Sequence, residues 1–168
     1  MMGAGIHGGF GATKGSNKVS KEIYKESRDK NYTREDLIDF IDGKTEQSSI
    51  IADKIRNGEI KISILGDQLF EKMFGVNYEV IGIAMGNKIY LRKNSSSIHS
   101  DIVHEGTHAV DFLNGLSYNK ISSWDGEIKA YTEEHYFQKA SGLALQFDNE
   151  NEIKIHVMSN YKKKGGRR

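Results

Sequence analysis

The hydrophobic positions in the first half of the chain follow a helical period in two neighbouring segments. Residues 33–43 and 45–57 each begin at a threonine and carry apolar side chains three or four positions apart, with Gly43 and Gly58 at their ends. A threonine hydroxyl caps the start of a helix, and glycine suits the left-handed residue that ends one. Both segments are therefore predicted to be helices, and residues 67–74 a shorter third.

Other short segments alternate apolar and polar residues. Residues 59–65 do so, and residues 78–84 and 88–92 flank the sequence Met85-Gly86-Asn87. A period of two is typical of a strand with one buried face, and a glycine-asparagine pair between two such runs favours a β-hairpin. Apolar residues at 153, 155 and 157 also alternate, which predicts a last strand there.

The segment after the hairpin combines an apolar face with a line of polar side chains. At 3.6 residues per turn, Asp101, His104, His108 and Asp111 fall on one side of a helix that is predicted to end at Asn114-Gly115. The opposite side is apolar and suits a hydrophobic core. Its residues are Ile98, Ile102, Val103, Ala109, Val110 and Leu113.

A further helix is predicted over residues 125–141. Its polar face carries Glu127, Tyr131, Glu134, His135 and Gln138. Three strands followed by two helices predict the α+β class, in which a small antiparallel or mixed sheet packs against the helix bearing His104 and the helix after it. Gly106 in the first of these helices costs about 0.8–1 kcal/mol relative to alanine, so we expect another backbone, such as a strand, to approach closely there.

Composition narrows the possible functions. The chain has 168 residues, which fits one domain, and its net charge of +1 argues against nucleic acid as a partner. It has no cysteine, so any metal site must be built from histidines and carboxylates. No apolar run approaches the roughly 18 residues of a membrane span, which predicts a soluble protein without membrane segments.

The two ends of the chain differ in composition from its middle. Residues 1–18 include six glycines and little to bury, which is typical of a flexible leader or linker, and no partner for His7 is evident. Residues 19–161 are predicted to form the domain, with at most a short helix over residues 19–32. Residues 162–168 are a basic tail.

The most distinctive sequence is His104-Glu105-Gly106-Thr107-His108. Histidines four apart on a helix point to one side and can bind the same metal ion. Glu105 can then face the open coordination position, where it would take a proton from a water. The simpler interpretation, two surface histidines on an ordinary helix, leaves a charged glutamate without a partner in an apolar-flanked helix, which is costly.

A catalytic zinc ion normally has three protein ligands and one open position. A third histidine six residues after His108 is absent, because Asn114 stands there. Glu127, at the start of the next helix, is favoured because two histidines and one glutamate are a common hydrolytic zinc set. The alternatives, one or two turns further along that helix, are Glu133, Glu134 and His135.

The motif with Ala109, Val110 and a distal Glu127 resembles the gluzincin branch of the zincin-like metallopeptidases, of which thermolysin is the familiar member. The segment 127–131 also resembles the C-terminal metallopeptidase modules of bacterial polymorphic toxins. This resemblance covers about 45 residues and implies a minimal zincin-like fold, with Zn²⁺ held by His104, His108 and Glu127. Thermolysin-like enzymes have an aspartate four residues after the ligand glutamate, where this chain has Tyr131. Asp111 is therefore the candidate for the carboxylate that supports a histidine ligand.

The resemblance implies a zinc-dependent metallopeptidase that serves as the catalytic domain of a toxin or effector. Its partners would be a protein or peptide substrate and a cognate immunity or inhibitor protein. It would be secreted, or delivered into a target cell as the C-terminal part of a larger bacterial protein.

Several residues are candidates for contacts with the substrate. Tyr131, His135 and Tyr118 are candidate donors to the oxyanion. Residues 82–84, on the expected edge strand, could hydrogen-bond an extended substrate by strand addition. The alternative function is a catalytically weak protein-binding module on a zincin scaffold. A third hypothesis, nucleic-acid binding through the basic tail, is disfavoured by the near-neutral charge.

Overall fold

The computed structural model describes residues 5–8, 31–116 and 123–161, and in these ranges it contains four strands and six helices. In chain order the elements are β1 (Gly5–Gly8), α2 (Arg34–Ile41), α3 (Glu46–Arg56), β2 (Lys61–Leu65), α4 (Asp67–Phe74), β3 (Val80–Met85), β4 (Lys88–Arg92), α5 (Ile98–Leu113), α6 (Ser123–Ser141) and α7 (Glu150–Asn160). The fold belongs to the α+β class, as predicted. Tyr118 lies outside the described residues, as do residues 19–30 and the basic tail.

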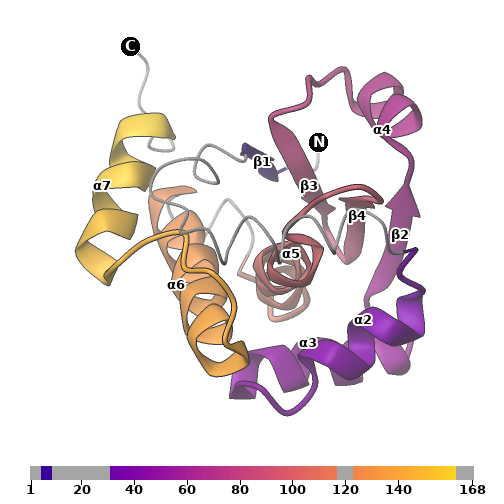
Figure 1. The fold of residues 1–168 in the computed structure, drawn as a ribbon, viewed down its shortest axis with the longest axis horizontal. Coiled ribbons are helices and arrows are strands. Elements are labelled where there is room, and N and C mark those ends of the chain that lie inside the picture. Colours follow the sequence, from indigo (N-terminus) through magenta and orange to yellow (C-terminus); the bar gives the residue numbers. More distant parts are fainter. Residues whose placement is uncertain (1–4, 9–30, 117–122, 162–168) are drawn as a thin grey trace.

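The strands form a mixed sheet in the order β1-β3-β4-β2 (Figure 1). The β3–β4 hairpin and the β1–β3 pair are antiparallel, whereas β2 is parallel to β4. A parallel pair needs a long crossover, which here consists of α4 and β3. The hairpin and the strand predicted from residues 59–65 are confirmed, with ends shifted by one or two residues.

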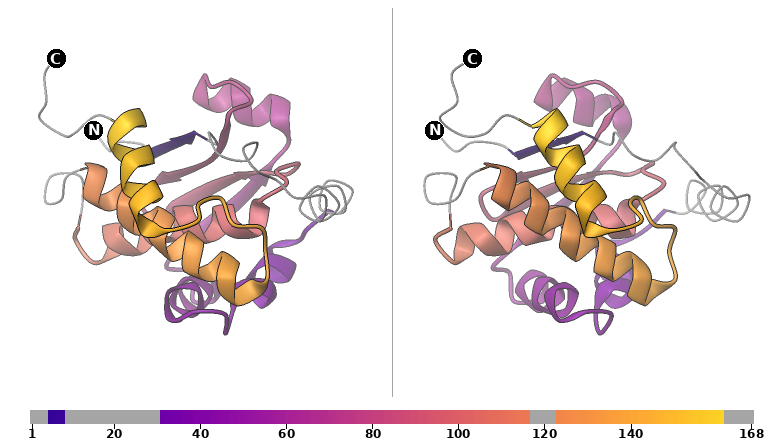
Figure 2. Two further views of the ribbon diagram at one scale, coloured as in Figure 1. Left: turned by 60° about the vertical axis from the view of Figure 1, so that its left-hand side comes forward. Right: turned by 90° about the vertical axis from the view of Figure 1, so that its left-hand side faces the viewer.

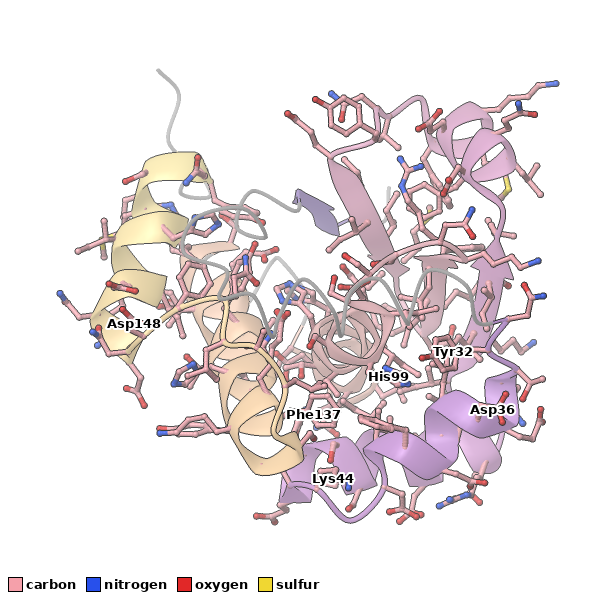
Figure 3. The ribbon with its side chains drawn as sticks, viewed as in Figure 1. Tyr32, Asp36, Lys44, His99, Phe137 and Asp148 are labelled. Carbon is pink, nitrogen blue, oxygen red and sulfur yellow. The ribbon has the colours of Figure 1, made fainter. Side chains whose placement is uncertain are left out.

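Helix α5 lies at the centre of the fold, between the sheet and α6, with α3 beneath it (Figures 1 and 2). The main hydrophobic cluster joins α2, α3, β4 and α5 with Phe137 of α6. Figure 3 labels Tyr32, His99 and Phe137 where α2, α5 and α6 meet. The His99 ring lies 4.0 Å from the Phe40 ring and 4.7 Å from the Tyr32 ring. Aromatic packing therefore holds the first turn of α5 in place.

The predicted caps of the first two helices are confirmed. The Thr33 hydroxyl accepts a hydrogen bond from the backbone N–H of Asp36, whose carboxylate accepts one from the Thr33 N–H. Thr45 and Ser48 form the same reciprocal arrangement at the start of α3. Each capping box satisfies two backbone donors that the first helical turn leaves without partners.

The guanidinium of Arg92 holds the start of β3 to the end of β4. This side chain is almost fully buried, and it donates hydrogen bonds to the carbonyls of Val80 and Asn77 and to the Glu71 carboxylate. Its guanidinium carbon lies 4.8 Å from the centre of the Phe70 ring. A buried guanidinium with carbonyl, carboxylate and aromatic partners is well satisfied, so it links α4 to both strands of the hairpin.

The strand predicted at residues 153–157 is wrong, because this segment belongs to helix α7. The Asn149 side chain caps the helix by accepting from the backbone N–H of Glu152. Ile153 and Val157 are fully buried, whereas Ile155 is 58% exposed. The buried positions are thus four apart, and the apparent alternation came from an exposed isoleucine between them.

The leader also departs from the prediction, since residues 5–8 form a strand rather than part of an irregular leader. Strand β1 pairs with β3, so β3 is not an edge strand at residues 82–84. None of the described helices combines the length and the apolar character needed to cross a bilayer.

Gly106 is needed where α5 crosses α3. A β-carbon at this position would lie 2.7 Å from Cγ2 and 2.8 Å from Cδ1 of Ile51, which is fully buried. The close neighbour is therefore a side chain of a helix, and not the backbone of a strand as the sequence led us to expect. Any larger residue at 106 must push α3 and α5 apart.

We predict that Gly106→Ala destabilises the protein by about 1–3 kcal/mol, because overpacking outweighs the gain of about 1 kcal/mol in helix propensity. Urea unfolding measures the change. In a double-mutant cycle, Ile51→Ala should remove the cost of Gly106→Ala, since it vacates the space that the new methyl group needs. Additive effects of the two substitutions would contradict the packing argument.

Candidate metal centre

Helices α5 and α6 together bring the candidate residues into one buried cluster. His104, Glu105 and His108 lie within two turns of α5, and Glu127 lies in the first two turns of α6. After α5 ends, Leu116 N–H bonds back to the Asp111 carbonyl and Gly115 adopts a positive φ of 74°. The chain therefore leaves the helix through a left-handed turn, and α6 packs alongside α5 (Figure 2).

The three predicted ligands face one another. The Glu127 carboxylate places Oε2 3.3 Å from His104 Nε2 and Oε1 3.3 Å from His108 Nε2. All three ligand atoms lie within 4.8 Å of one another. Tetrahedral ligands about 2.1 Å from a zinc ion are about 3.4 Å apart, and each imidazole nitrogen lies at about this separation from one of the two Glu127 oxygens. The geometry and the donor set fit a divalent cation that accepts imidazole and carboxylate ligands.

The other nitrogen of His104 is held by Glu134. His104 Nδ1 lies 3.0 Å from Glu134 Oε2, and the Gln138 amide donates to the other oxygen of Glu134 at 3.2 Å. The same amide lies 3.2 Å from Ser100 Oγ. Glu134 was an alternative for the third ligand. It lies instead behind His104, where a carboxylate fixes the tautomer and orientation of a metal-binding imidazole.

Asp111 does not take the supporting position predicted for it. Its Oδ1 forms an ion pair with Lys129 Nζ at 2.5 Å, so it links α5 to α6 beside the cluster. The Lys129 side chain of α6 neutralises Asp111, whereas Glu134 approaches His104 from the facing helix.

The remaining candidates on α6 surround the cluster. The Tyr131 ring packs edge-on to His104 at 4.5 Å, and its hydroxyl forms a hydrogen bond of 3.0 Å with the hydroxyl of Tyr161. His135 is buried, with its ring 5.9 Å from that of Tyr136. Among the described residues, neither Glu133 nor His135 belongs to the group that could hold a metal ion.

In the metal-free site, the neighbouring charges favour the protonated form of His104, which lies between α5 and α6. Burial disfavours the charged form of His104, but the nearby carboxylates of Glu127, Glu134 and Glu105 raise its pKa to about 10. Burial alone would raise the pKa of Glu127, but the charges of His108 and His104 and their hydrogen bonds lower it. A histidine cation therefore balances the carboxylate when no metal is bound, and a metal ion must displace that proton.

Glu105 is fully buried, and neither of its carboxylate oxygens has a hydrogen-bond partner among the described residues. Burial raises the pKa of Glu105 well above its ordinary value, and the nearby carboxylates add to the effect. Gly82 of β3 lies against this side chain, because a β-carbon there would be 2.9 Å from Glu105 Cγ. A buried carboxyl without a partner is costly, so Glu105 is a candidate functional residue beside the ligand group.

Two further residues belong to the site, and sequence reasoning did not assign them to it. Asp101 is fully buried and accepts hydrogen bonds from the hydroxyls of Ser95 and Ser97, and burial raises its pKa to about 7. His156 of α7 packs 5.2 Å from the Tyr131 ring, and burial lowers its pKa. The sequence signal that could have revealed His156 is the helical spacing of Ile153 and Val157. These two residues pack α7 against Tyr131.

Comparison of the chain with known protein families, with curated proteins and with solved structures gave no match. The case for the metal centre therefore rests on its own geometry and chemistry.

We predict that Glu134→Gln lowers the affinity for Zn²⁺ by about 10–100-fold, because it weakens the hold on His104. The matched variant Asp111→Asn should leave the affinity unchanged, since Asp111 pairs with Lys129. Competition against a chromophoric zinc chelator measures both. Equal losses in the two variants would show that Glu134 has no special part in orienting the ligand.

We predict that the metal-free protein loses stability as the pH rises from about 6.5 towards 10. His104 holds its proton up to about pH 10 when folded but only to its ordinary value of about 6.5 when unfolded, so the folded state binds more protons in this window. Asp101 adds the same trend between about pH 4 and 7. The melting temperature of the chelator-treated protein, measured as a function of pH, tests this. In the control variant His104→Gln, the melting temperature should change little between about pH 6.5 and 10. A melting temperature that rises over this range contradicts the assignment.

Proposed function

We propose that this chain is a zinc-dependent metallopeptidase that hydrolyses peptide bonds. The observation that carries the proposal is that the ligand atoms of His104, His108 and Glu127 lie within 4.8 Å of one another. Beside them lies the buried Glu105, whose carboxylate oxygens have no hydrogen-bond partner among the described residues. Two histidines, one glutamate and an adjacent free carboxylate are the parts that a hydrolytic zinc site requires.

Each residue of the site would have a separate role in hydrolysis. His104, His108 and Glu127 would hold a zinc ion, which would supply a water of lowered pKa and polarise the substrate carbonyl. Glu105 would serve as the general base for that water and would return the proton to the leaving amine. Burial alone disfavours the charged form of Glu105, and a cation at the neighbouring ligands would favour it. Glu134 binds the Nδ1 atom of His104, which leaves Nε2 directed towards the place that the metal ion would occupy.

We predict that Glu105→Gln retains zinc and lowers turnover by about 10²–10⁴-fold, because the amide cannot accept the proton. The comparison variant His108→Ala should lose both zinc and activity. Metal analysis, together with mass spectrometry of a digested peptide pool, gives the two readouts. Full activity in the Glu105→Gln protein would end this mechanism.

One observation favours the alternative, a protein-binding module on the same scaffold. His104 and Glu105 have no exposed surface in this conformation, so a substrate cannot reach them without a rearrangement. A zinc-loaded protein that binds peptides saturably but cleaves none of them would support the module over the peptidase. The toxin or effector context, and an immunity or inhibitor partner, rest on the sequence resemblance alone.

A further inference from the structure

Strand β1 occupies the sheet edge that a substrate would need. Gly5 pairs with Ala84, Ile6 with Ile83 and His7 with Gly82, in antiparallel orientation. These are the β3 residues that the sequence nominated for binding an extended peptide. A strand edge carries one row of backbone donors and acceptors, so it can pair with either β1 or a substrate, but not with both.

This edge lies directly beside the candidate general base. A β-carbon on Gly82 would lie 2.9 Å from Cγ and 3.0 Å from Oε1 of Glu105. Residues directly opposite on antiparallel strands share a face of the sheet, and neighbouring strands are about 4.8 Å apart. Position 7 is therefore the point on β1 paired with the residue that contacts Glu105. The other edge of the sheet is β2, two strands beyond β3.

The strand is also weakly held. It has four residues, two of them glycine, and its register with β3 shifts between His7 and Gly8. Glycine disfavours strands, and so short a pairing contributes little stability on its own. Covalent attachment to the domain raises its effective concentration, which lets a poor strand compete with a better one supplied from outside.

We propose that residues 82–84 of β3 are the docking edge for an extended peptide substrate, and that the chain's own residues 5–8 occupy this edge as an internal competitor. The inference rests on the proposed peptidase function for its consequence, which is that β1 must detach before a substrate can bind. It also defines the substrate class: an unfolded or extended segment that can run antiparallel to β3. Figure 1 shows β1 on the open side of β3, opposite to β4.

The first test weakens β1 in the full chain. The double variant Ile6→Pro/His7→Pro removes two consecutive backbone N–H groups, at least one of which faces β3. Ile6→Ala/His7→Ala is the matched control, since it changes the same side chains but keeps both N–H groups. With zinc bound, the proline variant should show a KM at least tenfold lower than the alanine control, with kcat unchanged. Equal constants in the two variants overturn the inference and leave the peptidase proposal intact.

The second test locks β1 in place. The chain has no cysteine, so Ile6→Cys/Ile83→Cys can form one disulfide only. Ile83 packs with Phe70 in a separate cluster, so the sulfur atoms lie away from the metal ligands. The oxidised protein should lose at least tenfold in kcat/KM and recover on reduction, whereas the single variant Ile83→Cys should not respond to reductant. An oxidised protein with undiminished activity overturns the inference.

A binding measurement separates this inference from the peptidase proposal. A fluorescent peptide of residues 1–12 should bind the proline variant at least tenfold more tightly than the alanine control, as measured by anisotropy. If no variant cleaves any peptide, the peptidase proposal fails, and this binding difference still decides whether β1 occupies a docking edge. Equal or absent binding overturns the inference.

Discussion

The central constraint on this structure is the burial of several ionisable groups between two helices. The α5–α6 interface and its surroundings hold two imidazoles and four carboxyl groups that are almost wholly removed from water: His104, His108, Asp101, Glu105, Glu127 and Glu134. Each such charge costs several kcal/mol to bury without a partner. The interface is stable only if these carboxyl groups are protonated or are balanced by positive charge. In the metal-free chain a proton on His104 provides part of that balance, and a dication would provide more.

Much of the surrounding fold serves to hold these groups. The hydroxyls of Ser95 and Ser97 satisfy Asp101 at the start of α5, and the amide of Gln138 fixes Glu134 behind His104. The aromatic ring of Tyr131 covers the other side of His104 and connects it to α7. The contacts of Glu134 and Tyr131 limit the rotamers of His104, as a rigid metal centre would require.

The sequence was most informative where local chemistry decides local structure. Thr33 and Thr45 start helices, alternation marks the hairpin, and the spacing of His104 and His108 places both on one side of α5. It was least informative where tertiary packing decides. Asp111 and Glu134 are both carboxylates one or two turns from a candidate ligand. The setting of α6 on α5 brings Lys129 to Asp111 and Glu134 to His104, and the sequence does not reveal that setting. The helix at residues 150–160 was missed because two buried residues four apart satisfy a strand pattern as well as a helical one. The pairing of β1 with β3 joins segments more than 70 residues apart, and no local signal encodes it.

Two glycines allow close packing of the central helix α5 against its neighbours. Gly106 of α5 receives Ile51 from α3, and Gly82 of β3 receives the stem of Glu105. A helix packed in this way has little freedom to shift, so larger side chains at its buried positions are costly. Substitutions are then best tolerated at the periphery, along the sheet margin and in the connections between elements, while the buried cluster of ionisable groups stays fixed.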